Sequence, residues 1–367
     1  MRVVFIGIEG IGKESMDIRQ RFVYEVAKKL IHQYGMDVTV VCDKEYQSQK
    51  DTNGIKLLYS DYSKSKNELM FYYDSLKKAL KHGDIIYSFG YLGGIFSFLI
   101  PKDKKFITNI DRLVYKSNKI NIAREYLFKL FYYLASQSSD ILLCNSYALE
   151  QYLLETYASK NTKVIEYGAH INRYLGNFDR KSKSLLAHYN LMKNNYHLVI
   201  ASPKAQNSTE IIIQGYQRSS RYHPLVIVGQ MKKSLYCYRL KKIANLSVIF
   251  IEEIHTKEEL DILRANAAHY IHGDTLGNDS HRLLEAIAAK KSILAHDNPF
   301  NREFLGEYGL YWRSPNELNR VINKVESQPI RYERNIEYNY KKIITYYNWR
   351  EISKRYYKLF KDLASER

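Results

Sequence analysis

Short apolar runs alternate with longer amphipathic segments along the first half of the chain. In Asp17–Tyr34, Phe22, Val26 and Leu30 recur at the spacing of one helix face, whereas Asp37–Cys42 is a continuous, largely apolar run. Apolar strands between helices are typical of a parallel sheet covered on both faces. The predicted strands are Arg2–Gly7, Asp37–Cys42, Ile55–Tyr59, Asp84–Tyr87, Lys105–Asn109, Asp140–Cys144 and Lys163–Glu166. The predicted helices are Asp17–Tyr34, Asn67–His82, Ile122–Ser136 and Ser146–Tyr157.

The alternation breaks once and then restarts. Residues 173–195 are polar, basic and poorly periodic, which favours a linker. Beyond them the predicted strands are Tyr196–Ala201, Pro224–Gly229, Ser247–Ile251, Ala268–Ile271 and Ser292–Ala295, and the predicted helices are Ser208–Ser219 and Arg282–Ala289. The pattern therefore predicts an α/β chain of two doubly wound, Rossmann-like domains over residues 1–172 and 196–330, with a ligand cleft between them.

The chain is strongly basic. Its 367 residues carry 56 Lys and Arg against 39 Asp and Glu, a net charge of +17. Such a charge attracts polyanions, namely nucleic acid, an anionic bilayer or phosphorylated substrates. No zinc signature, recognition-helix motif or aromatic stacking module accompanies the charge, so we expect no nucleic-acid partner. The alternative is a solvated basic surface without a specific partner.

Cysteine usage and hydropathy narrow the class of protein. The three cysteines are scattered, which excludes a disulfide scaffold and suits a reducing compartment. The isolated pair of His272 and Asp274 does not make a metal-ligand cluster, so the sequence predicts no metal. The longest uncharged stretch, Ile85–Ile100, is shorter than the roughly 20 residues of a spanning helix. The first residues do not resemble a secretory signal, and we expect a cytoplasmic protein.

The loop after the first strand holds Gly7, Gly10 and Gly12 in the order G-x-x-G-x-G. A dinucleotide fingerprint needs G-x-G-x-x-G, so this spacing argues against nicotinamide binding. The glycines allow either a tight turn at the strand end or a loop that faces a ligand. On the pattern alone three classes stay open: two-domain dehydrogenases, glycosyltransferases that use sugar nucleotides, and binding proteins.

The segment His272–Ala286, HGDTLGNDSHRLLEA, carries the clearest chemical signal. An apolar strand leads into a polar loop, and a helix begins near Asp279 or Ser280, both good N-cap residues. The helix N-terminus makes this loop a candidate anion site, because backbone N–H groups and the helix dipole meet there. The structural alternative is an ordinary strand-to-helix loop, with Glu285 as a solvated residue of the helix.

This segment resembles the donor-binding loop of retaining GT-B glycosyltransferases of the family 4 type, and most nearly that of the bacterial polysaccharide rhamnosyltransferase branch. YIHGDTLGNDSHRLLEA stands where the branch reads Y-x-H-G-H-x-V-G-G-T-N-P-S-L-L-E-A. Further resembling stretches are Asn109–Lys116, Asn145–Tyr152, Tyr167–Ala169, Ile200–Tyr216, Pro224–Gln230 and His296–Leu305. The resemblance implies a GT-B fold whose last helices, over residues 331–367, pack back on the N-terminal domain.

By this resemblance the N-terminal domain holds the acceptor and the C-terminal domain binds a nucleotide-diphospho-sugar, with no other cofactor. Glu285 matches the glutamate that binds the donor ribose, and Asp111 matches the acidic residue that orients or deprotonates the acceptor hydroxyl. The implied diphosphate contacts are Gly277, Asn278, Asp279 and Ser280, and the implied acceptor-side residues are Gly10, Gly12 and Lys13. The implied reaction transfers a hexose or deoxyhexose, in this branch rhamnose from dTDP-rhamnose, to a lipid-linked glycan of a bacterial surface polysaccharide, with retention of configuration.

Several motif positions differ from the branch. Ser202 stands where the branch has a phosphate-contacting arginine, and a serine does not replace its bidentate contact. Lys204 and Arg282 are the candidate cations for that contact. Arg112 follows Asp111 where the branch has glycine, and the structural alternative for Asp111 is a loop cap. Two interpretations stay open, namely an active retaining glycosyltransferase and a catalytically degenerate GT-B partner or scaffold of an active one.

Basic and aromatic residues concentrate over Lys102–Tyr133. The segment ends in the run YLFKLFYY, and aromatic rings beside lysines suit the headgroup region of an anionic membrane. We therefore expect peripheral attachment to the inner face of the plasma membrane, close to a lipid-linked oligosaccharide acceptor. The alternative is a core helix whose lysines extend to solvent. A protein partner in a polysaccharide assembly complex is a further expectation.

Overall fold

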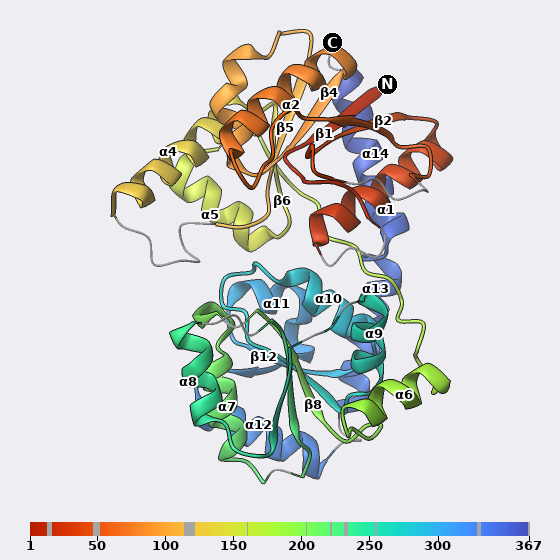
Figure 1. The fold of residues 1–367 in the computed structure, drawn as a ribbon, viewed down its shortest axis with the longest axis vertical. Helices are drawn as coiled ribbons and strands as arrows, with labels where there is room; N and C mark the ends of the chain where they lie inside the picture. Colours follow the sequence, from red (N-terminus) through yellow and green to blue (C-terminus); the bar gives the residue numbers. More distant parts are fainter. Residues whose placement is uncertain are drawn as a thin grey trace. The chain divides into compact units, whose positions relative to one another are not determined.

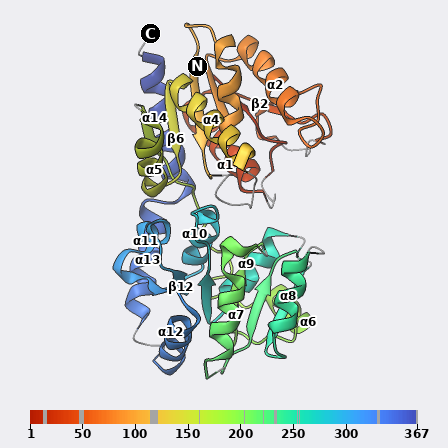
Figure 2. The same ribbon diagram turned by 90° about the vertical axis from the view of Figure 1, so that its left-hand side faces the viewer.

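The structure is a computed structural model that describes residues 1–12, 17–46, 52–113, 122–159, 161–202, 204–220, 222–230, 234–252, 254, 256–328 and 332–365. The chain forms two compact units. Unit 1 comprises Met1–Tyr167 and Trp349–Arg367, and unit 2 comprises Gly168–Asn348. Each unit is a parallel sheet with helices on both faces, as Figure 1 and Figure 2 show.

The sheet of unit 1 has seven strands in the order β3-β2-β1-β4-β5-β6-β7, all parallel. The strands are β1 (Arg2–Ile6), β2 (Asp37–Cys42), β3 (Lys56–Tyr59), β4 (Ile85–Phe89), β5 (Lys105–Ile110), β6 (Ile141–Cys144) and β7 (Thr162–Val164). The central strands are apolar along their length because helices cover both of their faces, and β4 is buried at every position.

The helices of unit 1 are α1 (Ile18–Tyr34), α2 (Glu68–His82), η1 (Tyr91–Leu99), α4 (Ile122–Ser138), α5 (Tyr147–Tyr157) and α14 (Trp349–Ser365). Alternate side chains of β1 point to opposite faces of the sheet. Phe5 lies 6.5 Å, between ring centroids, from Phe360 of α14, whereas Val4 and Ile6 pack in a cluster with Leu76 of α2. Because α14 also packs along α1, the last helix of the chain is part of the core of unit 1.

The sheet of unit 2 repeats the same arrangement with six parallel strands in the order β10-β9-β8-β11-β12-β13. The strands are β8 (His197–Ile200), β9 (Leu225–Val228), β10 (Val248–Ile251), β11 (His269–His272), β12 (Ser292–His296) and β13 (Leu310–Trp312). In both units the strand order reverses at the first strand, between β1 and β4 and between β8 and β11.

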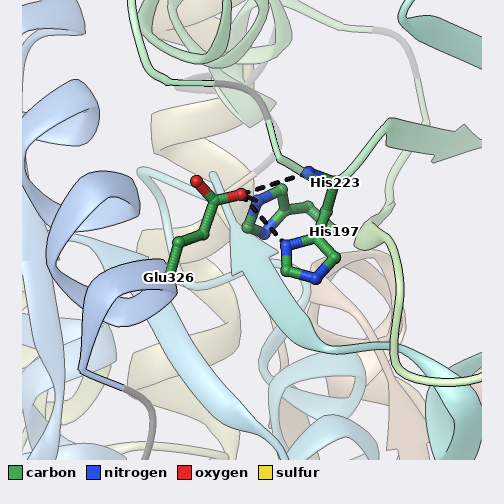
Figure 3. A group of neighbouring side chains, drawn as sticks. All are labelled: His197, His223 and Glu326. Carbon is green, nitrogen blue, oxygen red and sulfur yellow. Dashed lines mark hydrogen bonds and ion pairs between the residues drawn. The ribbon is translucent and has the colours of Figure 1, made fainter.

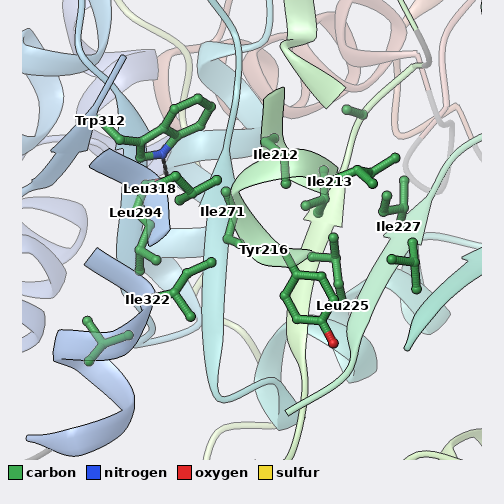
Figure 4. Close-up of a cluster of buried hydrophobic side chains, with 14 of the residues drawn as sticks. Ile212, Ile213, Tyr216, Leu225, Ile227, Ile271, Leu294, Trp312, Leu318 and Ile322 are labelled. Carbon is green, nitrogen blue, oxygen red and sulfur yellow. Dashed lines mark hydrogen bonds between the residues drawn. The ribbon is translucent and has the colours of Figure 1, made fainter. Parts of the chain in front are cut away.

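The helices of unit 2 are α6 (Arg180–His188), α7 (Thr209–Gln217), α8 (Leu235–Ile243), α9 (Lys257–Asn266), α10 (Ser280–Ala288), α11 (Pro299–Leu305), α12 (Pro315–Ser327) and α13 (Glu333–Thr345), with the short turns η2 (Ala205–Asn207) and η3 (Gly306–Tyr308). Helices α7, α8 and α12 lie together on one side of the sheet (Figure 1). Figure 4 shows the core they cover, where Tyr216, Ile271 and Leu318 are fully buried. Trp312 closes this core and donates from Nε1 to the Leu294 carbonyl over 3.1 Å.

The predicted strands are confirmed, each within two residues at either end, and so is the doubly wound α/β class. Strand β13 lies outside the prediction because three residues are too short for a periodic signal. Helices α6, α8, α9, α11 and α12 also lie outside it as separate elements.

Two parts of the predicted domain organisation differ from the structure. Residues 173–195, expected as a linker, belong to unit 2, where α6 packs against α9. The polar composition of this stretch conceals a short buried stripe, Ser182 and Leu186. Residues 333–345, expected to pack on the N-terminal domain, form α13, which packs against α10 inside unit 2. Of the described C-terminal helices, only α14 lies in unit 1.

Two further findings concern membrane-spanning helices and the cysteines. No helix in the described ranges is both long enough and apolar enough to cross a membrane. All three cysteines are free thiols at buried positions.

Phe360→Ala tests how much α14 contributes to the core of unit 1. Phe360 is fully buried and lies against the rings of Phe5, Tyr87 and Tyr356. We expect the variant to lose about 3–5 kcal/mol in free energy of unfolding, because it leaves a cavity in a close-packed core. Urea denaturation followed by circular dichroism measures the loss. Phe98→Ala is the control, since Phe98 is 79 % exposed, and equal losses in the two variants would contradict the assignment.

Candidate functional site

The loops on either side of the strand-order reversal meet at the carboxyl edge of each sheet, which is the usual ligand site of parallel α/β sheets. In unit 2 these loops are residues 201–208 and 273–279. They touch directly, because Thr275 N donates to the Gln206 carbonyl over 3.0 Å. A Cβ on Gly273 would lie 2.1 Å from the Asn207 carbonyl oxygen, so the close approach requires glycine. The structure thus brings the predicted donor residues of both loops together.

Helix α10 begins at Ser280, directly after the second loop. Asp279 is its N-cap residue, but the Asp279 side chain makes no capping hydrogen bond, and the first turn of α10 holds no acidic residue. Gly277 has a φ of +72°, and a Cβ there would lie 2.4 Å from the ring of Phe300. Backbone conformation and space therefore both require glycine. The loop leads into a helix N-terminus whose partial positive charge suits an anion.

Two buried polar atoms of this loop have no hydrogen-bond partner among the described residues, namely His272 Nε2 and Asn278 Oδ1. Buried polar atoms are nearly always hydrogen-bonded, so each is a candidate contact for a ligand. Burial lowers the pKa of His272 to about 4, and the imidazole is therefore neutral at pH 7. On the sequence alone, His272 stood out only through its pairing with Asp274, which does not make a metal-ligand cluster.

Asp274 anchors the loop from inside. Its carboxylate accepts from the backbone N–H of Leu276 over 3.0 Å and from that of Asp279 over 2.8 Å. Its carbonyl oxygen accepts from the side-chain amides of Asn298 and Asn301 at 2.9 and 3.0 Å. Burial, and then the nearby charge of Asp279, raise the pKa of Asp274 to about 6. Asp274 therefore fixes the shape of the loop.

The two candidate phosphate cations, Lys204 and Arg282, lie near Asp279. Arg282 Nη1 is 2.7 Å from Asp279 Oδ2, so the charge of Arg282 is paired with a carboxylate in this structure. Lys204 is exposed. Burial raises the pKa of Asp279, but the charges around it, those of Arg282 and Lys204 among them, outweigh burial and hold this pKa below its ordinary value. Ser202 is half-buried, and its carbonyl accepts from Asn207 Nδ2 over 2.8 Å.

Glu285 is held by an arginine that the sequence analysis did not identify. Arg264, near the end of α9, is 1 % exposed, and its Nη2 lies 2.6 Å from Glu285 Oε2. Its Nη1 lies 3.2 Å from Asp261 Oδ1. Such a buried pair fixes both partners, because losing one leaves an uncompensated charge. The sequence signal that could have identified Arg264 is its position directly after Leu263, inside an apolar stretch.

In unit 1, Asp111 follows β5 directly and is bound by Arg19 of α1. Arg19 donates from Nε to Asp111 Oδ2 over 2.7 Å and from Nη2 to Oδ1 over 2.6 Å. Tyr167 donates its hydroxyl to Oδ2 over 3.1 Å, and Arg112 Nε lies 3.7 Å from Oδ1. The side chain of Asp111 is 8 % exposed. The sequence analysis assigned no role to Arg19 or to this pair.

The charge of Asp111 is therefore already neutralised. Burial raises the pKa of Asp111, but Arg19 and then Arg112 outweigh burial and hold this pKa well below its ordinary value. A general base works best with a pKa near the working pH. Of the two roles implied by the family resemblance, the geometry favours orientation of a ligand over removal of a proton.

The predicted acceptor-side loop is described in part. Gly10 and Gly12 are buried in the loop after β1. A Cβ on Gly10 would lie 2.3 Å from the ring of Tyr46, so this glycine is required for packing of the loop. Lys13 lies outside the described residues.

A cavity of about 1050 Å³ lies elsewhere in unit 2, among α6, β10 and α9. It contains none of the predicted donor residues. Its lining includes Glu252, Glu258 and Glu259 beside Arg180 and Lys181, so its charge is mixed. Carboxylates at this density do not suit a diphosphate, and we do not assign the donor to this cavity.

One group of side chains in the described ranges has the composition of a metal site, although the sequence analysis predicted none. His197, His223 and Glu326 bring three ligand atoms within 4.8 Å of one another (Figure 3). They lie at the amino ends of β8 and β9 and near the end of α12, on the edge of the sheet opposite to the donor loops.

Comparison with known proteins identifies the fold. Residues 213–342, which include all of α10, match the family described as Glycosyl transferases group 1. No curated protein matches the chain. Similar solved structures include a sucrose-phosphate synthase from Thermosynechococcus elongatus, with a TM-score of 0.78, 13 % identity and 100 % of both chains covered. HepE from Anabaena in complex with UDP-glucose gives a TM-score of 0.75 at 14 % identity, over 99 % of this chain and 100 % of that chain. WaaG, a glycosyltransferase involved in lipopolysaccharide biosynthesis, gives 0.71 at 14 % identity, over 96 % and 98 %.

The fold is GT-B. The predicted fold is thereby confirmed, and the group 1 match over residues 213–342 supports a glycosyltransferase. The rhamnosyltransferase branch and retention of configuration stay predictions.

Asp274→Asn tests the raised pKa in the loop before α10. Asp274 keeps its proton in the folded chain up to about pH 6, whereas an unfolded aspartate releases it near pH 3.9. The contribution of this carboxyl group to the free energy of unfolding therefore falls as the pH rises from about 4 to about 6. Asparagine does not titrate. Over that range the stability of the variant should improve relative to wild type by about 1–3 kcal/mol.

Urea denaturation at several pH values measures this difference, and the other titrating groups cancel between the two proteins. Asp103→Asn, at an exposed position, is the control for the substitution itself. A difference for Asp274→Asn that stays flat from pH 4 to 7 would rule out the raised pKa.

Proposed function

We propose that this chain is a glycosyltransferase that takes a hexose or deoxyhexose from a nucleotide-diphospho-sugar. The observation that carries the proposal is the group 1 match over residues 213–342, a range that includes the α10 N-terminus and Glu285. The HepE structure with UDP-glucose supports a nucleotide sugar as donor. In this proposal unit 2 binds the donor and unit 1 binds the acceptor.

The donor loop offers separate contacts for the diphosphate and the ribose. Backbone N–H groups near the start of α10, together with its dipole, suit the diphosphate. Lys204 and Arg282 supply cations, which stabilise the leaving diphosphate as its charge develops. The Glu285 carboxylate accepts hydrogen bonds from the ribose hydroxyls, and its ion pair with Arg264 keeps it ionised and in place.

Asp279 is the main electrostatic obstacle to a diphosphate at this loop. Its carboxylate lies at the start of α10 and is paired with Arg282. A bound diphosphate would have to take Arg282 from Asp279 and would meet the charge of Asp279 itself. Replacing Asp279 by a neutral residue therefore removes a repulsion and releases a cation at the same time.

The acceptor and the identity of the transferred sugar are the second part of the proposed reaction. We infer that Asp111, fixed by Arg19, orients an acceptor hydroxyl. The motif resemblance favours transfer of rhamnose from dTDP-rhamnose to a lipid-linked glycan with retention of configuration. The similarity of fold to WaaG is consistent with a glycan of the bacterial surface.

The second candidate function is a GT-B partner or scaffold without turnover. Two observations favour it: Ser202 stands in place of the phosphate-contacting arginine, and Arg282 is occupied by Asp279. Nucleotide binding separates the two candidates.

Calorimetry with UDP, dTDP and GDP tests the donor site, and a panel of nucleotide sugars then tests hydrolysis and transfer. We expect one of the nucleotides to bind. Lys204→Ala and Arg282→Ala should each weaken binding at least fivefold, since a charge-assisted hydrogen bond contributes about 1–3 kcal/mol. Asp279→Asn should strengthen binding, because it removes a negative charge from the phosphate site and releases Arg282.

Arg218→Ala is the matched control, because Arg218 lies at the far end of α7 and is exposed. It should leave nucleotide affinity unchanged. If the wild-type chain binds none of the three nucleotides, the donor-binding proposal is wrong, and the result favours a partner without turnover.

Helix α4 carries a wide apolar surface in contact with solvent. Its exposed large apolar side chains are Ile122, Tyr126, Leu127, Leu130, Tyr133 and Leu134. Its buried residues are Tyr132, Ala135 and Ser136. This distribution argues against the alternative of a core helix. On these grounds we propose that α4 rests on an anionic membrane surface, with its aromatic rings at headgroup depth and Lys129 beside them.

Flotation with vesicles tests the membrane proposal. We expect the chain to float with anionic vesicles at low salt and less well at high salt, because screening shortens the reach of its basic residues. Leu130→Glu should abolish flotation, whereas Leu235→Glu, on α8 and 90 % exposed against 50 % for Leu130, should not. Equal recovery with neutral and anionic vesicles, or none with either, would count against membrane attachment.

A further inference from the structure

Three potential metal ligands from distant parts of the sequence meet at the amino edge of the sheet in unit 2. His197 is the first residue of β8, and His223 lies just before β9. Glu326 lies in the last turn of α12. Figure 3 shows both imidazole rings directed at the Glu326 carboxylate. The group is separate from the donor loops, which lie at the opposite ends of the same strands.

The distances within the group are short. Glu326 Oε1 lies 2.9 Å from His197 Nε2 and 3.1 Å from His223 Nδ1. The backbone N–H of His223 also donates to the same oxygen over 3.3 Å. One carboxylate oxygen thus faces two imidazole nitrogens, and all three ligand atoms lie within 4.8 Å of one another.

The second oxygen of the carboxylate has no such contact. Glu326 Oε2 is buried without a hydrogen-bond partner among the described residues, and so is Nδ1 of His197. The side chains of His197 and Glu326 are both 0 % exposed. Leaving a carboxylate oxygen buried and unpaired is costly, so Glu326 Oε2 indicates a ligand that the protein side chains do not supply. His197 Nδ1 lies across its ring from Nε2 and does not face the same position.

A third histidine packs beside the site. His269, the first residue of β11, stacks on His197 with ring centroids 5.2 Å apart and planes at 25°. Its ring is buried against His197, and its Nδ1 has no hydrogen-bond partner among the described residues.

We propose that His197, His223 and Glu326 form a binding site for one divalent transition-metal ion, of which Zn²⁺ fits best. Two imidazoles and one carboxylate are a common ligand set for Zn²⁺. Zn–N and Zn–O distances of about 2.0–2.2 Å place tetrahedral ligands about 3.3 Å apart. The observed 2.9 and 3.1 Å lie a few tenths of an ångström below that value, so small side-chain movements would admit the ion.

The ion would stabilise the fold of unit 2 rather than act in transfer. Its ligands come from β8, the loop before β9 and α12, so the ion would tie α12 to two neighbouring strands of the sheet. The 22 % exposed ring of His223 provides the route of entry. Because the donor loops lie at the other edge of the sheet, nucleotide binding and metal binding are independent.

Titration of the full chain with Zn²⁺, in competition with a chromogenic chelator, tests the site. We expect one equivalent to bind tightly and to raise the melting temperature, since it binds only the folded chain. Co²⁺ in place of Zn²⁺ should give the visible absorption of a four-coordinate ion. His223→Ala should weaken Zn²⁺ binding more than about 100-fold, because loss of a ligand exceeds the 10–100-fold effect of losing a residue behind one.

His188→Ala is the matched control, since His188 is an exposed histidine in the same unit, and it should keep full affinity. His223 is partly exposed, so its loss leaves the core intact, and circular dichroism without metal verifies the fold. Glu326→Gln provides a second variant that should lose binding. The proposal fails if the wild-type chain does not bind one equivalent of Zn²⁺, or if His223→Ala and Glu326→Gln bind it as tightly as His188→Ala.

Discussion

The arrangement of parallel strands is the constraint on which the rest of this structure depends. A chain that runs outward from a central strand, first to one side and then to the other, brings the loops after two neighbouring strands together at the carboxyl edge. Both units obey this rule, and Asp279 in unit 2 and Asp111 in unit 1 follow strands at this edge. Gly273 shows how closely the loops approach, because any side chain there would overlap the Asn207 carbonyl.

Buried arginine–carboxylate pairs then decide what those loops can do. Arg264 holds Glu285 and Arg19 holds Asp111, and both arginines are mostly buried. A carboxylate in such a pair is fixed in place and stays ionised, which suits the binding of hydroxyl groups better than the transfer of protons. At the donor loop the same chemistry works against the ligand, because Arg282 is paired with Asp279.

The two edges of the sheet in unit 2 differ in chemistry. The carboxyl edge offers a helix N-terminus and cations, as an anion site requires. The amino edge gathers two imidazoles around a buried carboxylate, a set of groups that suits a cation. In the two proposals, the opposite edges of one sheet thus take ligands of opposite charge.

The sequence by itself determined the doubly wound class and the strands other than β13, and it predicted the loop before α10 as the donor loop. These features are local, because burial on both faces makes a strand apolar throughout and a helix start needs a cap within a few residues. It did not determine the partners of the key side chains. Arg19 and Asp111 are 92 residues apart, and His197 and Glu326 are 129 apart. No periodic pattern links such positions, since only the strand order and the packing of helices on the sheet bring them together. The same reason explains why α13 was expected on the wrong unit. Its apolar stripe specifies that one face of the helix is buried, and only the tertiary structure decides which element covers that face.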